Sequence, residues 1–309
     1  MSKGPAKTIE DITEGFAKHQ YICSEQISTA VYLANELEKP ILIEGPPGVG
    51  KTELANTAAL YYEKELLRLQ CYEGLDETKA LYEWRYGKQL LYTQILKEQM
   101  SEVLEGAKGL KESLDRLSKF EDIFFSEQFL ESRPLLQSLT STEGNVLLID
   151  EVDKADEEFE ALLLEILSEF QVSIPELGVR KAVVKPLVIL TSNNSREIGD
   201  ALKRRCLHLY IPFPDAKLER EIIRARVPEI SKKLQVQLVD FVQGLRELDL
   251  KKLPAISETI DWARTLIILN ADELNQDLAR STLNVLLKHQ QDIEVVQKEV
   301  PRLVMASDG

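Results

Sequence analysis

The chain has 309 residues, 44% of them apolar, and a formal net charge of −14 at pH 7, so it can fold as one large or two medium domains. No apolar run approaches the ~20 residues that cross a bilayer and the N-terminus lacks a signal core, which together predict a cytoplasmic protein without a membrane span. Three scattered cysteines and three histidines argue against a disulfide framework or a thiolate or histidine metal site, and the acidity makes nucleic acid an unlikely partner and a protein partner more natural.

Residues 1–39 read as a short polar tail followed by two amphipathic helices. Apolar residues at helical spacing indicate both helices. We expect these helices to pack against the rest of the fold through Ile9, Ile12 and Phe16 in the first and Ile27, Val31 and Ala34 in the second.

A short apolar run at residues 40–44 leads into the sequence GPPGVGKT, and good helix formers follow it. Glycines at such a strand-to-helix turn let successive backbone N–H groups surround a polyphosphate, and the helix N-terminus adds its positive end. Lys51 would bind the β and γ phosphates, and the Thr52 hydroxyl would bind Mg²⁺. An ordinary Gly/Pro turn is the alternative. The predicted nucleotide-binding residues are Gly45, Pro46, Pro47, Gly48, Val49, Gly50, Lys51, Thr52 and Glu53.

Residues 65–71 alternate well enough to form a second strand, after which Asp76 is expected to cap a helix that carries Leu81 and Trp84. A long, charged stretch of helical period then separates the phosphate loop from the next core strand, and we interpret residues 88–133 as an insertion. Its aromatic residues could form a binding patch, but core packing is the better explanation for Phe120, Phe124, Phe125 and Phe129.

Residues 145–151, NVLLIDE, form an apolar strand that ends in two acids. Parallel strands of an α/β fold bring their carboxyl ends to one edge, where ligands bind, so these acids should lie beside Lys51 and Thr52. Asp150 would hold Mg²⁺ through water, and Glu151 would orient and polarise the attacking water. The alternative is that both acids cap the start of a helix.

A clear amphipathic helix spans Phe159 to Phe170, and a β-hairpin is predicted over residues 171–183. The next strand, residues 186–192, delivers Asn193 and Asn194 to the same sheet edge. An amide there can hold the water or sense the γ-phosphate, although an Asn-rich turn explains either residue taken singly.

The segment ALKRRC precedes a last strand at residues 207–211, in which we expect His208 to be an ordinary, satisfied strand residue. Only helical periods follow. The predicted fold is therefore α/β, a three-layer P-loop NTPase with a parallel sheet at residues 40–214, followed by an all-α lid domain at residues 215–309.

Taken in order, GPPGVGKT, LLIDEVDKAD, the hairpin, LTSNN and ALKRRC, followed by a helical lid, resemble an AAA+ ATPase. Within that class the pattern is most similar to the MoxR family and its carbon-monoxide-dehydrogenase maturation branch (CoxD-like). The resemblance implies a Walker A loop at residues 45–52 and Walker B acids at Asp150 and Glu151. It also implies a sensor 1 residue at Asn193 or Asn194 and an arginine finger at Arg204 or Arg205. Of the two arginines we favour Arg205, because it lies nearer the following strand.

The resemblance further implies a homo-oligomeric ring, usually a hexamer, that acts with a von Willebrand A domain protein to remodel or mature a protein client. ATP is favoured over GTP because the chain has no N-K-x-D motif. One departure is that residues 255–258 read AISE where the family commonly has a sensor 2 arginine. Two other functions stay open: an AAA+ nucleic-acid motor or helicase loader whose hairpin touches DNA through Arg180, Lys181 and Lys185, and a nucleotide-gated scaffold with negligible turnover.

Overall fold

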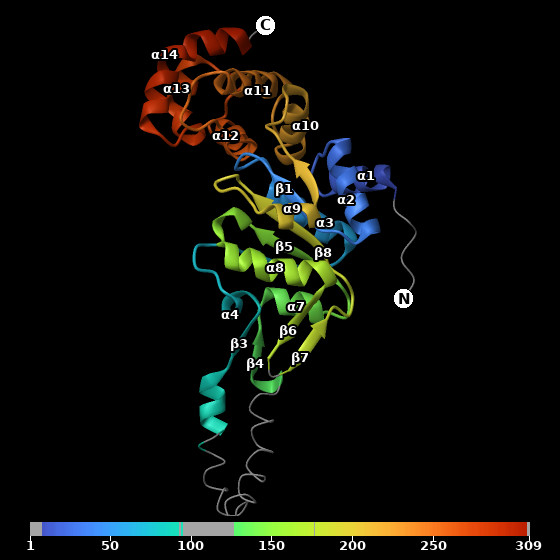
Figure 1. The fold of residues 1–309 in the computed structure, drawn as a ribbon. Coiled ribbons are helices and arrows are strands. Elements are labelled where there is room, and N and C mark those ends of the chain that lie inside the picture. Colours follow the sequence, from blue (N-terminus) through green and yellow to red (C-terminus); the bar gives the residue numbers. More distant parts are fainter. Residues whose placement is uncertain (1–7, 93, 95–126, 176, 308–309) are drawn as a thin grey trace, which may run out of the picture.

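The computed structural model describes residues 8–92, 94, 127–175 and 177–307 (Figure 1). Its centre is a five-stranded sheet in which every pairing is parallel. This confirms the predicted α/β fold class. In spatial order the strands are β2 (Glu65–Gln70), β5 (Asn145–Asp150), β8 (Leu187–Ser192), β1 (Ile41–Glu44) and β9 (Leu207–Tyr210).

Helices cover both faces of the sheet, because alternate residues of the buried strands point to opposite sides. Leu147 and Ile149 of β5 pack toward one face, whereas Val146 and Leu148 pack toward the other. The first face is covered by α7 (Pro134–Thr140), α8 (Glu157–Glu169) and α9 (Asp200–Arg205). The second face is covered by α1 (Ile9–Lys18), α2 (Glu25–Leu37) and α3 (Lys51–Tyr62).

The two expected N-terminal helices are present. Thr8 and Asp11 form a capping box at the start of α1, which satisfies backbone N–H groups that the first turn leaves without partners. The predicted apolar faces of α1 and α2 lie in the core beside α3, except that Ile9 is only half-buried.

The helix predicted after Asp76 is wrong in extent. Asp76 caps a helix, but α4 (Glu77–Ala80) is a single turn, and Trp84 lies in a strand, β3 (Tyr82–Trp84). This strand pairs antiparallel with β4 (Leu130–Ser132), at the far end of the predicted insertion. Phe129, which closes the 3-10 turn Glu127–Phe129, is fully buried, as expected for core packing. The predictions for Phe120, Phe124 and Phe125 lie outside the described residues.

The predicted hairpin after α8 is confirmed. It consists of β6 (Gln171–Ile174) and β7 (Gly178–Lys181), and they pair antiparallel. The turn Val152–Lys154 links β5 to α8.

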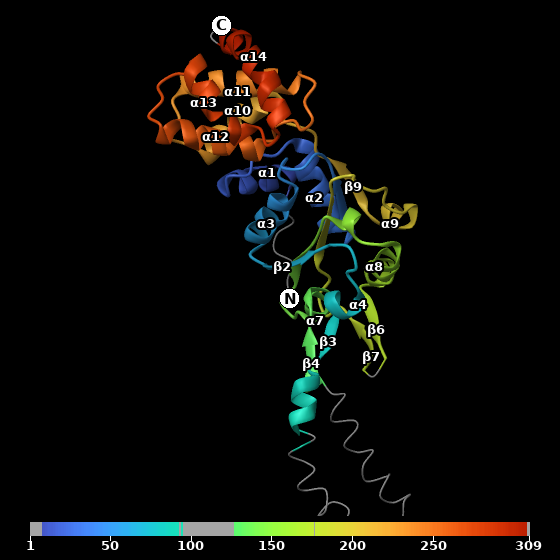
Figure 2. The same ribbon diagram turned by 90° about the vertical axis from the view of Figure 1, so that its left-hand side faces the viewer.

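Five helices after the sheet share a hydrophobic core of their own, in which Phe241 and Trp262 are fully buried. In both views these helices and the paired strands β3 and β4 lie on opposite sides of the central sheet's domain (Figures 1 and 2). No helix among the described residues is long and apolar enough to cross a membrane. The domain boundaries at 39/40 and 214/215 stay predictions. The five helices are α10 (Ala216–Arg226), α11 (Lys232–Arg246), α12 (Ile256–Ile268), α13 (Gln276–Leu286) and α14 (Gln290–Ser307).

Candidate active site

The glycine-rich loop lies between the end of β1 and the first turn of α3, as the sequence predicted. Gly48 has φ of +77° and Gly50 has φ of +95°, conformations that side chains with a Cβ rarely adopt. A Cβ on Gly48 would also lie 2.7 Å from the Ser257 hydroxyl oxygen. The loop geometry therefore requires glycine at both positions.

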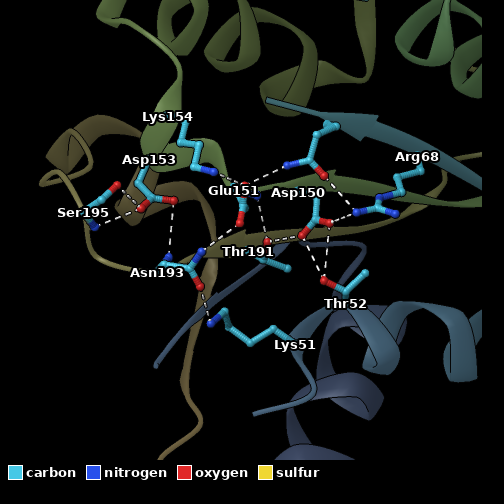
Figure 3. Close-up of polar contacts among 11 residues, drawn as sticks. Lys51, Thr52, Arg68, Asp150, Glu151, Asp153, Lys154, Thr191, Asn193 and Ser195 are labelled. Atoms are coloured by element: carbon cyan, nitrogen blue, oxygen red, sulfur yellow. Dashed lines mark hydrogen bonds and ion pairs between the residues drawn. The ribbon is translucent and has the colours of Figure 1, made fainter. Parts of the chain in front are cut away.

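Lys51 is the first residue of α3, and only 6% of its surface is exposed. Its Nζ donates hydrogen bonds of 2.7 Å to the carbonyl oxygens of Gly45 and Pro46. A third bond of 2.7 Å goes to Oδ1 of Asn193 (Figure 3). These three acceptors match the three donors of an ammonium group. Burial lowers the pKa of Lys51 to about 8, and the carboxylates of Asp153, Asp150 and Glu151 partly oppose that shift.

Asp150 ends β5 with 3% of its surface exposed. Its Oδ1 accepts from the hydroxyls of Thr191, at 2.6 Å, and of Thr52, at 3.1 Å. Its Oδ2 lies 2.5 Å from the Arg68 guanidinium. Thr52 and Asp150 thus place a hydroxyl and a carboxylate side by side, which are hard oxygen donors of the kind that Mg²⁺ prefers.

Glu151 follows with a left-handed backbone, φ +57°, and its N–H donates to the Thr191 hydroxyl. This backbone turn separates its carboxylate from that of Asp150. Glu151 Oε1 accepts from Asn193 Nδ2 at 3.0 Å. Oε2 accepts from Gln70 Nε2 at 2.9 Å and from Lys154 Nζ at 2.5 Å. Asn193 therefore bridges Lys51 and Glu151 directly (Figure 3).

The two asparagines after β8 do different things. Asn193 reaches into the site, whereas the side chain of Asn194 accepts, among the described residues, only a local bond from Ser192, at 3.4 Å. Asp153 fixes the loop that carries them, since its carboxylate accepts from the N–H of Asn193 at 3.3 Å and of Ser195 at 2.9 Å. Burial raises the pKa of Asp153, but its hydrogen bonds lower the pKa more, so it lies below its usual value.

Six residues of this network were not predicted from the sequence: Arg68, Gln70, Asp153, Lys154, Thr191 and Ser195. A signal existed for the first two, because the alternation of residues 65–71 places them on one side of an edge strand whose end meets the acidic pair. For Asp153 and Thr191 the sequence gives no such signal, because each acts on a segment about 40 residues away.

Comparison with known families decides the class. The model of the AAA domain (dynein-related subfamily) matches residues 40–206, which is more than half of the chain. The chain belongs to this AAA domain family.

Similar proteins and solved structures give less information about this chain than the family match does. An uncharacterized protein of Staphylococcus haemolyticus is 25% identical over 261 residues, which cover 82% of this chain and 85% of the relative. One from Staphylococcus aureus strain USA300 is 24% identical over 240 residues, 76% of this chain and 78% of the relative. Among solved structures, RuvB of Thermotoga maritima, described as a Holliday junction branch migration motor, is 18% identical with a TM-score of 0.47, covering 90% of this chain and 72% of that one.

Beside the phosphate loop of this AAA domain lies a largely apolar cleft of about 200 Å³ that sequence reasoning missed. Its walls come from three regions far apart in the chain, so no local pattern could reveal it. They include Tyr21 before α2, Val49 of the loop, Ile211 after β9, and Ile222 and Ile260 of the C-terminal helices. Such walls suit a flat heteroaromatic ring next to bound phosphates.

Three more of the predicted residues lie outside this hydrogen-bonded network: Glu53, which lines the apolar cleft, and the two arginines, which were expected to face away from their own phosphate loop. Glu53 pairs with Arg226 of α10 at 2.9 Å, so this carboxylate ties α3 to the C-terminal helices. Arg205 donates to the Ser168 hydroxyl at 2.6 Å and to the Ala201 carbonyl at 2.9 Å. Arg204 is exposed and makes no hydrogen bond or ion pair with any residue that the structure describes.

The C-terminal helices of the AAA chain touch the phosphate loop without an arginine at the predicted sensor 2 position. The N–H of Ser257 donates to the Gly48 carbonyl at 3.4 Å. Glu258 turns back to accept from the N–H of Ala255 and the hydroxyl of Ser257. The start of α12 therefore sits on the loop through backbone and hydroxyl groups.

Proposed function

We propose that this chain is a Mg²⁺-dependent ATPase. The observation that supports it best is the convergence of Lys51, Thr52, Asp150, Glu151 and Asn193. These residues come from the first turn of α3 and the ends of β5 and β8, up to 142 residues apart, and they form one hydrogen-bonded network. A cluster of ion pairs that only stabilises the fold needs no glycine-rich loop beside it. A nucleotide site needs both the loop and the cluster.

In this proposal each residue has one task. Lys51 exchanges the two loop carbonyls for the β and γ phosphates, and Thr52 and Asp150 hold Mg²⁺. Bound Mg²⁺ would neutralise charge on the phosphates. Glu151, which Asn193 holds at 3.0 Å, orients and polarises the attacking water. Asn193 rather than Asn194 is then the sensor 1 residue, because it alone contacts both Lys51 and Glu151.

ATP is the proposed nucleotide. The apolar cleft beside Val49 and Gly50 offers the base hydrophobic walls. The sequence also lacks the N-K-x-D motif that selects guanine.

We further propose a ring, hexameric by family resemblance, in which a neighbour's arginine completes each site. Arg204 fits that role better than Arg205, since the guanidinium of Arg205 is already bonded within its own subunit. The client is a protein that the ring remodels or matures in the MoxR manner, together with a von Willebrand A domain partner. The net charge of −14 supports a protein target over a nucleic acid.

Client capture tests the remodelling function. Glu151→Gln should bind ATP without hydrolysing it, and so should retain the client and the partner. Lys51→Ala serves as the matched control that cannot bind nucleotide. Proteins recovered with Glu151→Gln and ATP, absent with Lys51→Ala and identified by mass spectrometry, would support remodelling. Equal recovery on both variants would count against it.

A nucleic-acid motor is the second candidate, favoured by the largely exposed second strand of the hairpin, β7, which carries Lys181. Lys185, the third predicted DNA contact, instead pairs with Glu38 at 2.7 Å. A salt-dependent shift of labelled DNA near 100 mM salt, of the kind that phosphate contacts produce, would place this candidate first. The remaining alternative, a nucleotide-gated scaffold, is distinguished from an ATPase by a phosphate-release assay, because a scaffold would show negligible turnover.

A further inference from the structure

Arg68 makes a contact that the proposed chemistry does not require. Its Nη2 lies 2.5 Å from Oδ2 of Asp150, the carboxylate that would hold Mg²⁺. The same nitrogen donates to Oε1 of Gln70 at 2.8 Å. Gln70 in turn donates to Glu151, so β2 contacts both acids at the end of β5.

The contact leaves the carboxylate of Asp150 fully engaged. Oδ1 accepts from two hydroxyls, and Oδ2 accepts from Arg68 and, at 3.3 Å, from Thr52. A metal ion, or the water through which it binds, needs one of these oxygens. Thr191 cannot easily give up its bond to Asp150, because it is buried and its hydroxyl oxygen also accepts a hydrogen bond from the N–H of Glu151. Arg68 is the partner free to move.

The position of Arg68 allows that movement. Its side chain is 52% exposed, while the Asp150 side chain is 4% exposed. β2 is an edge strand, so the guanidinium can turn toward solvent without opening the core. An arginine loses little by returning to water, whereas the buried carboxylate always needs a cationic or hydrogen-bonding partner.

We propose that Arg68 is a positioning residue that pairs with the metal-binding oxygen of Asp150 and competes with Mg²⁺ for it. The inference rests on the proposed function. The guanidinium keeps the carboxylate paired and correctly placed until Mg²⁺ displaces it, and it sets the Mg²⁺ concentration at which nucleotide is bound tightly.

The test measures binding rather than turnover. ADP affinity is determined by calorimetry over a series of free Mg²⁺ concentrations and in EDTA, for wild type, Arg68→Ala and Arg68→Gln. We expect both variants to lower the half-saturating Mg²⁺ concentration about 3- to 10-fold, the range of one partly exposed charged contact. Their ADP affinity in EDTA should change less than twofold. Arg68→Lys, which retains a cation, should restore most of the wild-type Mg²⁺ dependence.

Arg85→Ala is the matched control, because Arg85 is also half-exposed and pairs with an acid, Glu131, outside the site. An equal shift in this control would mean that net charge alone is responsible, and would overturn the proposal. An unchanged or raised half-saturating Mg²⁺ concentration in both Arg68→Ala and Arg68→Gln would also overturn it, while leaving the ATPase assignment intact. Wild-type ADP binding without any Mg²⁺ dependence would overturn both.

Discussion

Replacing Lys51 by alanine should abolish tight nucleotide binding. A unit charge about 4 Å from a phosphate charge is worth about 4 kcal/mol at an effective dielectric constant of 20. In the structure the ammonium is bonded to three oxygens at 2.7 Å, and exchanging two of them for phosphate oxygens costs about 1 kcal/mol in net hydrogen bonding. The expected loss is therefore about 3 kcal/mol, or ~150-fold in Kd.

Calorimetry of ATP binding at pH 7 measures this loss directly. Lys154→Ala is the control, because it removes the same charge from a lysine that contacts Glu151 rather than the loop. We expect it to weaken ATP binding less than threefold. Thermal unfolding of both variants checks that the loop change is local. Equal ATP affinity for wild type and a folded Lys51→Ala protein would refute the reasoning.

Three further predictions concern protonation and assembly. Because burial lowers the pKa of Lys51 to about 8 and bound phosphates must raise it, ATP binding should take up close to one proton at pH 9 and almost none at pH 7. The ATP affinity should accordingly fall as pH rises through 8, by up to tenfold per pH unit. Calorimetry in buffers of different ionisation enthalpy detects both the proton uptake and the change in affinity. Arg204→Ala/Arg205→Ala subunits mixed with Lys51→Ala subunits should recover part of the activity that neither has alone; mixed rings that form and recover nothing would argue against a trans arginine. Light scattering should give a larger mass with a slowly hydrolysed ATP analogue than with ADP, and equal masses would contradict assembly through the γ-phosphate.

The sheet and the phosphate loop could be predicted from the sequence because both are encoded locally. All five strands of the central sheet are short apolar or alternating runs, and the loop has a fixed glycine spacing whose φ angles only glycine adopts easily. The convergence of Lys51, Thr52 and Asp150 follows from strand direction alone, since parallel neighbours end at one edge. The choice between Asn193 and Asn194 needed the left-handed turn at Asn194, φ +58°, which no spacing rule indicates.

Where sequence reasoning failed, the deciding partner lies far along the chain. Residues 77–84 have a helical period, yet Trp84 pairs with Leu130 in a two-stranded sheet, and this tertiary contact overrides local preference. The Arg68–Asp150 pair spans 82 residues and depends on the register between β2 and β5. The apolar cleft depends on the docking of the C-terminal helices against the loop.

The central claim, that Glu151 activates water for ATP hydrolysis, is tested most directly by phosphate release under saturating Mg²⁺ and ATP. Glu151→Gln preserves the size of the side chain and its bond from Asn193 Nδ2 to Oε1, but cannot act as a base. We expect ATP to bind with wild-type affinity while phosphate release falls ~10²- to 10⁴-fold, the usual contribution of a general base. Phosphate release by Glu151→Gln at the wild-type rate would contradict it.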